Sequence, residues 1–272
     1  NTGNFLSGVE KGNNEKEGKK MLKITDLHVT FHKGTIHERV ALNNVGYEVQ
    51  ADDFITILGT NGAGKSTLLN CIAGNIEPDK GKIELDGMDI TWMKEYKRAK
   101  MIGRLFQDPL KGTAPNMTIL ENLGLAYSRG KRSTLSRAIK KSDIPYFKEQ
   151  LAKLNLGLEN RMDAKVGLLS GGQRQALTLM MATLVTPKLL LLDEHTAALD
   201  PKTADTIMNV TDAIVKENHI PTIMITHNMK QALTYGNKLL VMNEGRIVKE
   251  LTGVEKQQTT VDQLLKMYDL AA

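Results

Sequence analysis

The period of the hydrophobic positions changes along the chain. Over residues 22–50 apolar and polar side chains alternate, which predicts a pair of half-buried strands. The continuous apolar run DFITILG (53–59) then predicts a strand that is buried on both faces of a parallel sheet. A glycine-rich loop leads from it into a helix predicted from Lys65 to about Ala73. Strand, loop and helix in this order predict the start of a mononucleotide-binding unit.

The pattern further along predicts both sheet and helical regions. GKIELDGMDI (81–90) favours a short hairpin that turns at Asp86 and Gly87. Between about Asp108 and Val185 helical periodicity replaces the strand signals, which predicts an inserted helical subdomain over about 108–185. Another strand is predicted within 101–107, before the insertion, and strands return after it within 188–194, 221–227 and 237–248. The expected fold class is α/β: a mostly parallel core, an antiparallel β subdomain and a helical insertion.

Composition limits the alternatives. The 272 residues, 41% of them hydrophobic, suffice for one large domain over 21–272. Residues 1–20, rich in Gly, Asn, Lys and Glu, have the composition of a disordered leader or a remnant of cloning. The net charge of +5 is spread among many acids, which argues against nucleic acid as a partner. Apolar runs such as LLLL (189–192) are far shorter than the roughly 18–20 residues that span a bilayer.

The loop GTNGAGKST (59–67) matches the phosphate-binding pattern G-x-x-x-x-G-K-[ST] at Gly59, Gly64, Lys65 and Ser66. Glycines allow backbone N–H groups to curl around a phosphate, Lys65 supplies a positive charge and Ser66 offers its hydroxyl to Mg²⁺. The alternative is an ordinary glycine-rich turn. Because a strand precedes the loop and a helix follows it, we expect the loop to bind ATP.

Two carboxylates end a later apolar strand, LLLLDE (189–194). Adjacent side chains at a strand end point to opposite sides, so one can reach Mg²⁺ while the other reaches an attacking water. We assign Asp193 to the metal and Glu194 to the general base. Taken alone, such a pair is more often solvated surface charge.

His227 stands at the tip of the next apolar strand, where doubly wound sheets bind their ligands. It is expected to contact the γ-phosphate or to orient the attacking water. His28, His32 and His37 suggest an alternative metal site, but no carboxylate or cysteine near them completes a ligand set.

A second phosphate cradle lies in VGLLSGGQRQAL (166–177), where Ser170 caps a helix that begins with two glycines. It can reach the phosphates bound at Lys65 only from the opposite side of the nucleotide. A two-fold dimer satisfies this geometry, because each subunit then presents its 170–172 segment to the ATP of the other.

In this order the motifs resemble those of the ATP-binding subunit of an ABC transporter, over essentially the whole chain from Met21. The matching segments are 59–67, Gln107, 169–173, 189–194, 197–200 and His227. The residues expected to bind ATP are Phe31, Gly59, Asn61, Gly62, Ala63, Gly64, Lys65, Ser66, Thr67, Ser170, Gly171, Gly172, Gln173 and Asp200.

The resemblance also implies roles that spacing alone does not give. Gln107 would sense Mg²⁺ and the attacking water, which makes it a metal and catalytic candidate beside Ser66 and Asp193. Asp200 would communicate across the dimer. An aromatic side chain would stack on adenine, and we choose Phe31 because it ends the first strand. One departure is His195, where the family commonly has proline.

The function implied is that of an ATPase that dimerises around two ATP molecules and drives a separate membrane permease from the cytoplasmic face of the membrane. GRLFQDPLKGTAPNMTILENL (103–123) and LLLLDEHTAALDPKTA (189–204) are similar to a bacterial branch of uptake ATPases. These work with permease and substrate-binding subunits, some of them for amino acids such as tryptophan. We therefore expect uptake of a small solute such as an amino acid.

Two other functions remain open from the sequence. A non-transport ABC ATPase for cofactor assembly or cell-envelope remodelling would carry the same catalytic residues and differ in its partner. A small-molecule kinase would use the loop at Lys65 but leaves LSGGQ (169–173) unexplained.

Overall fold

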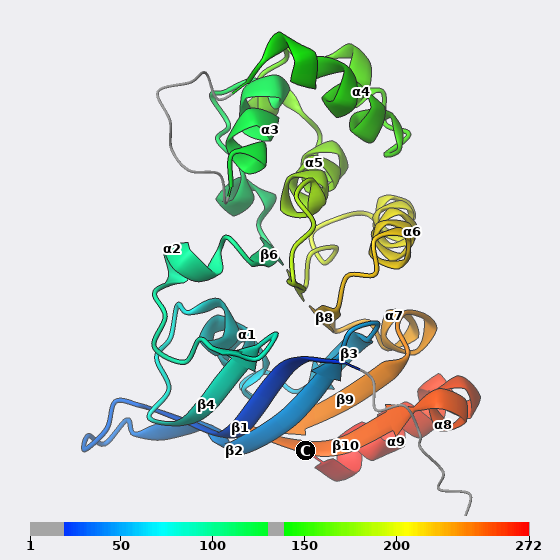
Figure 1. Cartoon of the computed structure of the whole chain (residues 1–272). Coiled ribbons are helices and arrows are strands. Elements are labelled where there is room, and N and C mark those ends of the chain that lie inside the picture. Colours follow the sequence, from blue (N-terminus) through cyan, green and yellow to red (C-terminus); the bar gives the residue numbers. More distant parts are fainter. Residues whose placement is uncertain (1–18, 130–138, 272) are drawn as a thin grey trace, which may run out of the picture.

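The computed structural model describes residues 19–129 and 139–271, without the side chains of 268–271. Nearly all of the leader predicted over 1–20 lies outside these residues, and β1 begins at Lys20. Figure 1 shows helices α3, α4 and α5 at one end of the molecule and a sheet containing β1, β2 and β4 at the other. A second sheet, which includes β6 and β8, runs between these two ends.

The smaller sheet has four antiparallel strands in the order β2-β1-β4-β5. Asp86 and Gly87 connect β4 and β5 with φ of 50° and 77°, the positive values that a two-residue hairpin turn needs. The hairpin predicted at these two residues is confirmed. The strands are β1 (Lys20–Phe31), β2 (Arg39–Gln50), β4 (Lys80–Leu85) and β5 (Met88–Asp89).

The larger sheet has six strands in the order β10-β9-β3-β8-β7-β6, and all except β10 run parallel. The position of β7 between two hydrophobic cores explains why its sequence is continuously apolar. Leu189 and Leu191 enter the core shared with α1 and the smaller sheet, whereas Leu190 and Leu192 enter the core shared with α3 and α5. The strands are β3 (Phe54–Gly59), β6 (Ile102–Leu105), β7 (Leu189–Asp193), β8 (Thr222–Ile225), β9 (Lys238–Asn243) and β10 (Arg246–Thr252).

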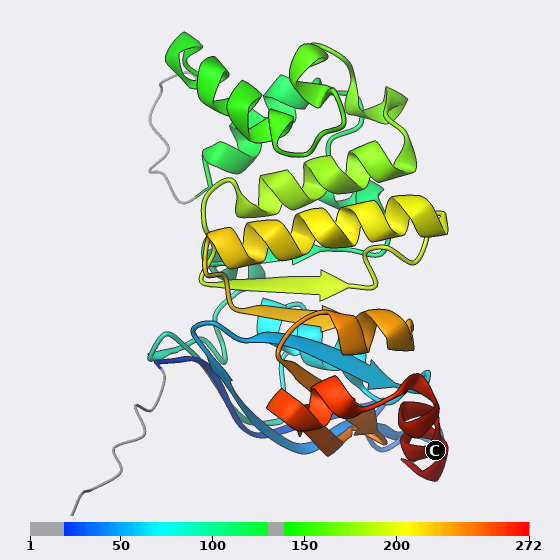
Figure 2. The ribbon, with the colours of Figure 1, turned by 90° about the vertical axis from the view of Figure 1, so that its right-hand side faces the viewer.

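Helices cover both faces of the six-stranded sheet. Helix α1 contributes Leu69 and Ile72 to the core between the two sheets. Helices α5 and α6 lie side by side across the opposite face, drawn yellow-green and yellow in Figure 2. The helices are α1 (Lys65–Ala73), α2 (Glu95–Arg98), α3 (Ile119–Tyr127), α4 (Ile144–Ala152), α5 (Gly171–Thr183), α6 (Pro201–Glu217), α7 (Met229–Thr234), α8 (Gly253–Gln258) and α9 (Val261–Ala271). Short 3₁₀ turns occur at η1 (Pro109–Gly112), η2 (Lys141–Asp143), η3 (Leu158–Asn160) and η4 (Val166–Leu168).

The α/β fold class predicted from the sequence is confirmed, and α1 has the bounds expected of it. Helices α3, α4 and α5 fall within 108–185, whose limits as a subdomain stay a prediction. In the part of the chain that the structure describes, no helix has both the length and the apolar character needed to cross a bilayer.

The parallel strands bring distant segments to one edge. Because β3, β8, β7 and β6 are parallel, their carboxyl ends meet at the same edge of the sheet. The glycine loop follows β3, Asp193 ends β7, and His227 and Gln107 come two residues after β8 and β6. We call this the carboxyl edge, and the opposite edge, where β3 and β8 begin, the amino edge.

Candidate nucleotide-binding site

The loop between β3 and α1 needs its glycines for conformation and for space. Gly64 caps α1 in the left-handed region at φ 100°, and a Cβ on it would lie 2.4 Å from Ala41 O. A Cβ on Gly59 would lie 2.4 Å from Met242 O. No side chain in the described part of the chain caps α1, so its first N–H groups remain available to an anion.

Lys65 is the cation of this loop. Its side chain folds back so that Nζ donates to Gly59 O at 2.7 Å and to Thr60 O at 2.9 Å, and the residue is only 5% exposed. Burial lowers the pKa of Lys65, while the charges of Glu194 and Asp193 act in the opposite direction. Lys65 forms no ion pair among the described residues, so its charge is available to a phosphate.

A cavity of about 170 Å³ opens in front of the loop. Gly59 and Ala63 do not line it and instead shape the loop from behind; Ala63 is buried and its carbonyl accepts from Gly245 N. The structure brings these predicted residues together on the cavity wall: Phe31, Asn61, Gly62, Gly64, Lys65, Ser66, Thr67 and Glu194.

The two carboxylates at the end of β7 face different neighbours. Glu194 has a left-handed backbone (φ 47°), and its Oε1 lies 2.6 Å from His227 Nε2. Asp193 turns toward β6, where its Oδ2 lies 3.6 Å from an Arg104 nitrogen. Burial is the main reason that the pKa of Asp193 is raised; Glu194 adds to it, and Arg104 and Lys65 oppose it. The residues therefore point apart, as the strand geometry predicts.

Gln107 does not line the cavity in front of Lys65. It is exposed and borders a separate cavity of about 650 Å³, together with Arg104 and Asp193. The structure thus places Gln107 near the expected metal ligand Asp193 but not in the cavity that Ser66 borders.

The second cradle, at 170–173, has the predicted helix cap but lies away from the cavity at Lys65. Ser170 Oγ accepts from Gln173 N, and Gln173 Oε1 accepts from Ser170 N, each at 3.2 Å. Asp200 caps the neighbouring helix α6 by accepting from Thr203 N at 3.1 Å. In the described part of the chain, neither 170–173 nor Asp200 lines the cavity at Lys65.

The two glycines of this cradle have different surroundings. Gly171 is exposed, whereas a Cβ on Gly172 would lie 2.3 Å from Thr203 Cγ2. Gly172 is therefore needed for the close approach of α5 to α6, a packing reason that the sequence pattern does not reveal.

Two residues at the site, Arg39 and Arg104, were not recognised from the sequence, and the environment of a third, His195, could not be predicted from it. Arg39 pairs with Phe31 across β1 and β2, lines the cavity and donates to Gly62 O at 2.7 Å. Arg104 contacts Asp193. His195 is 2% exposed, and burial lowers its pKa to about 4. The signal for Arg104 is a charged residue inside an apolar strand; Arg39 gives no local signal, because it is far from the loop in sequence.

The donors available to a metal are oxygens. Across 19–129 and 139–271, no three His, Cys, Asp or Glu side chains gather as a ligand set, and His28, His32 and His37 form none. The Ser66 hydroxyl and the Asp193 carboxylate fit Mg²⁺, which prefers oxygen ligands and usually keeps waters and substrate phosphates in its coordination shell.

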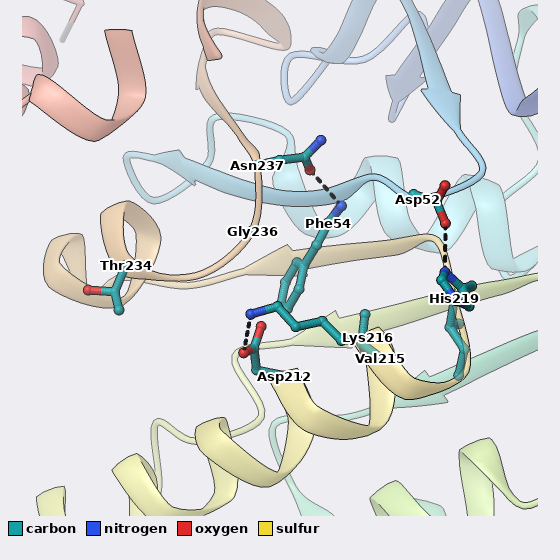
Figure 3. A pocket seen from close by; sticks show the side chains of 10 residues that line it. Asp52, Phe54, Asp212, Val215, Lys216, His219, Thr234, Gly236 and Asn237 are labelled. Atoms are coloured by element: carbon teal, nitrogen blue, oxygen red, sulfur yellow. Dashed lines mark hydrogen bonds and ion pairs between the residues drawn. The ribbon is translucent and has the colours of Figure 1, made fainter. Parts of the chain in front are cut away.

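Another cavity, of about 550 Å³, lies at the amino edge between α6 and the loop that joins α7 to β9. Figure 3 shows Phe54 in it, with the ion pairs Asp52–His219 and Asp212–Lys216 on its walls. None of the predicted site residues lines it.

The sequence profile of the ABC transporter family matches residues 42–197. A tyrosine transport ATP-binding protein of Clostridioides difficile (strain R20291) is 43% identical, over 92% of this chain and 100% of its own. A phosphonates import ATP-binding protein of Ruegeria sp. (strain TM1040) is 34% identical, over 84% of this chain and 88% of its own.

Solved structures agree with these relatives. A dimeric ATP-binding cassette in a post-hydrolysis state with ADP and Pi superimposes with a TM-score of 0.73 at 27% identity, covering 88% of this chain and 100% of that one. The ADP conformation of another ABC transporter cassette gives 0.75 at 28% identity, covering 93% and 99%. The chain therefore belongs to the ABC transporter family and is one of its ATP-binding, ATP-hydrolysing subunits.

Proposed function

We propose that the carboxyl edge holds MgATP for hydrolysis and that this hydrolysis drives uptake of an aromatic amino acid through a separate permease. The observation that carries the first part is that Lys65 and Glu194 border the same cavity. One is the cation suited to phosphates, and the other is the carboxylate suited to activating water.

The triphosphate lies over the start of α1. The β- and γ-phosphates are bound by the first backbone N–H groups of α1, which no described side chain caps, and by the buried ammonium of Lys65. A cavity of about 170 Å³ is smaller than the roughly 300 Å³ of ordinary small-molecule sites. The base therefore lies at its mouth, where Phe31 stacks on adenine.

Ser66, Asp193 and Gln107 would hold Mg²⁺, which neutralises phosphate charge when bound. Ser66 borders the cavity directly, whereas Asp193 and Gln107 approach from the β6 side. Gln107 therefore reports on the metal only when its segment moves toward Ser66.

Glu194 acts as the general base toward the attacking water. His227 keeps the carboxylate in place, because Nε2 and Oε1 are 2.6 Å apart. His227 is 45% exposed, so it can also turn toward the γ-phosphate when a nucleotide enters.

The second copy of the chain supplies the remaining contacts. The phosphates held by the partner's loop are bound by the start of α5, at Ser170, Gly171, Gly172 and Gln173. Asp200, at the start of α6, couples dimer closure at one nucleotide site to the other site. Ser170 and Gly171 are exposed, as this requires. Association around two ATP molecules and separation after hydrolysis provide the motion that drives transport.

The transport assignment is supported by the relative named for tyrosine transport, which matches along its whole length. We propose that the chain lies peripherally at the cytoplasmic face of the membrane, on a permease that receives tyrosine or a similar amino acid from an extracytoplasmic binding protein. No observation favours the alternative in cofactor assembly or envelope remodelling.

The test is purification of the chain from gently solubilised native membranes, with mass spectrometry of what accompanies it. The expected result is a polytopic permease, and uptake of labelled tyrosine, phenylalanine or tryptophan that is lost when Glu194→Gln replaces the native chain. A soluble complex without a permease would contradict the transport proposal, while normal ATP hydrolysis would leave the enzymatic part intact.

A further inference from the structure

Arg104 lies among the groups that shape the nucleotide site, although none of the roles above uses it. Its Nη1 donates to Asn75 Oδ1 at 2.6 Å, and its Nη2 donates to Asn70 Oδ1 at 2.8 Å. Nη2 is also 3.6 Å from Asp193 Oδ2. Asn70 belongs to α1 and Asn75 follows its end. One guanidinium thus joins the helix of the phosphate loop, the end of β7 and the strand that leads to Gln107.

The surroundings of Arg104 fix it in place. The side chain is 12% exposed, and its guanidinium carbon lies 4.6 Å from the centre of the Phe106 ring. Within the described residues its Nε is buried without a hydrogen-bond partner. An incompletely satisfied buried cation is costly, so a purely structural position would favour an apolar residue in this strand. Asp193 is the nearby group that makes the charge useful.

The three polar contacts of Arg104 differ in length. The two bonds to asparagine oxygens are short and set the position of the guanidinium, whereas the contact with Asp193 is longer and is made to one carboxylate oxygen. An anchored cation that attracts one oxygen leaves the other free to face a ligand.

Two cations therefore attract the same carboxylate. Lys65, on the other side of the site, also interacts electrostatically with Asp193. Without Arg104 the attraction of Lys65 would be unopposed and would draw the carboxylate away from the orientation that the guanidinium sets.

We propose that Arg104 is a positioning residue that holds Asp193 away from Lys65, in the orientation that receives Mg²⁺. The inference rests on the proposed function, because it requires Asp193 to act at the metal. Removing a residue that orients a metal ligand in this way lowers the metal affinity by about 10- to 100-fold.

The experiment measures binding of a fluorescent, non-hydrolysable ATP analogue to the full chain while Mg²⁺ is titrated. Arg104→Met is expected to require at least about tenfold more Mg²⁺ for half-maximal effect, while binding without Mg²⁺ stays within about twofold of the native chain. Arg104→Lys should recover part of the loss, because it keeps the charge but not the planar fork.

Three further variants separate positioning from folding. Asp193→Asn combined with Arg104→Met should have the Mg²⁺ requirement of Asp193→Asn alone, since Arg104 acts through Asp193. Asn75→Ala removes one of the two asparagine contacts of the guanidinium and leaves its charge and the contact with Asn70. It should shift the requirement in the same direction by a smaller factor, which keeps the test usable if Arg104→Met does not fold. Arg161→Met, an exposed arginine, is the matched control and should change nothing.

An unchanged Mg²⁺ requirement in folded Arg104→Met would overturn the inference. So would an equal loss of binding with and without Mg²⁺, since Arg104 would then only support α1. A native chain that binds no nucleotide at any Mg²⁺ concentration would refute the proposed function itself.

Discussion

The amino and carboxyl edges of the six-stranded sheet both carry ion pairs, but they differ in what surrounds their lysine. At the amino edge, Asp52 pairs with His219 at 3.1 Å and Asp212 with Lys216 at 2.7 Å, as Figure 3 shows. At the carboxyl edge, Lys65 donates to the carbonyls of Gly59 and Thr60 and forms no ion pair within the described residues, none of whose side chains caps α1.

Cavity volume does not identify the nucleotide site, because the larger of the two cavities lies at the amino edge. The amino-edge cavity is about 550 Å³ and the one at Lys65 about 170 Å³. The informative difference is that, among the described residues, Lys65 has no carboxylate in an ion pair with it and the helix start beside it has no side-chain cap. Such an arrangement costs stability and is retained where a ligand supplies the missing negative charge.

The largest expected effect of breaking this contrast is at Glu194. Glu194→Gln should bind MgATP but hydrolyse it at least about 100-fold more slowly, a typical loss for a positioned base. The matched control is Asp212→Asn, which neutralises a carboxylate at the amino edge and should leave turnover within about twofold, since surface ion pairs contribute little. Steady-state phosphate release measures both, and near-normal turnover by Glu194→Gln would rule out its role.

The next largest effect concerns the second copy. In the Glu194→Gln background, Ser170→Arg should weaken ATP-dependent dimerisation at least about 30-fold, because a long side chain at a central contact displaces the phosphates. Light scattering with and without MgATP measures the dimer.

Two controls isolate the interface from the helix cap. Ser170→Ala removes the hydroxyl, and with it a cap worth about 1 kcal/mol, but adds no bulk, so it should weaken the dimer much less than Ser170→Arg does. Thr260→Arg alters an equivalent cap, since Thr260 Oγ1 accepts from Gln263 N at 3.2 Å, far from the nucleotide motifs in sequence. A dimer that forms equally well with Ser170→Arg would remove the second cradle from the account.

A smaller effect follows from His195. Burial lowers its pKa to about 4, so the folded chain keeps the ring neutral while the unfolded chain protonates it below about 6.5. Unfolding therefore takes up a proton in this range, and lowering the pH from 7.5 to 5 should cost about 2 kcal/mol of stability through this residue. Urea denaturation of the native chain and His195→Gln measures the difference.

The control for His195 is His219→Gln at the amino edge, where the histidine side chain is 80% exposed. It should retain the full pH dependence of the native chain. If His195→Gln also retains the full pH dependence, the assignment of a neutral, buried His195 ring is wrong.

The smallest effect is at Phe31. Phe31→Ala should weaken ATP binding by up to about tenfold, the range of one aromatic stacking contact, whereas Phe31→Trp should preserve it. Trp92→Ala, at an exposed aromatic that borders none of the cavities described above, is the control. Equal affinities for all variants would mean that adenine lies elsewhere.

Local signals were enough to predict much of this fold. The apolar run of β3, the glycine loop and the helix from Lys65 could be read in order, and the turn at Asp86 and Gly87 follows from residues that adopt positive φ readily. In each case the residues that determine the structure are neighbours in the sequence.

The remaining features depend on register and packing between distant segments. Arg39 reaches Gly62 because β2 lies beside the loop, and Arg104 reaches Asn70 because β6 ends near α1. Gly172 matches a phosphate cradle by pattern, yet its missing Cβ also makes room for Thr203. The sequence alone does not show which distant segments come into contact or how closely they approach.

The most direct test of the central claim is a crystal structure of Glu194→Gln with MgATP. The account predicts a two-fold dimer with two nucleotides, each bound by Lys65 of one subunit and by the Ser170 helix start of the other, with Phe31 against adenine. A monomer whose nucleotide contacts only one chain, or a nucleotide in the amino-edge cavity, would contradict it.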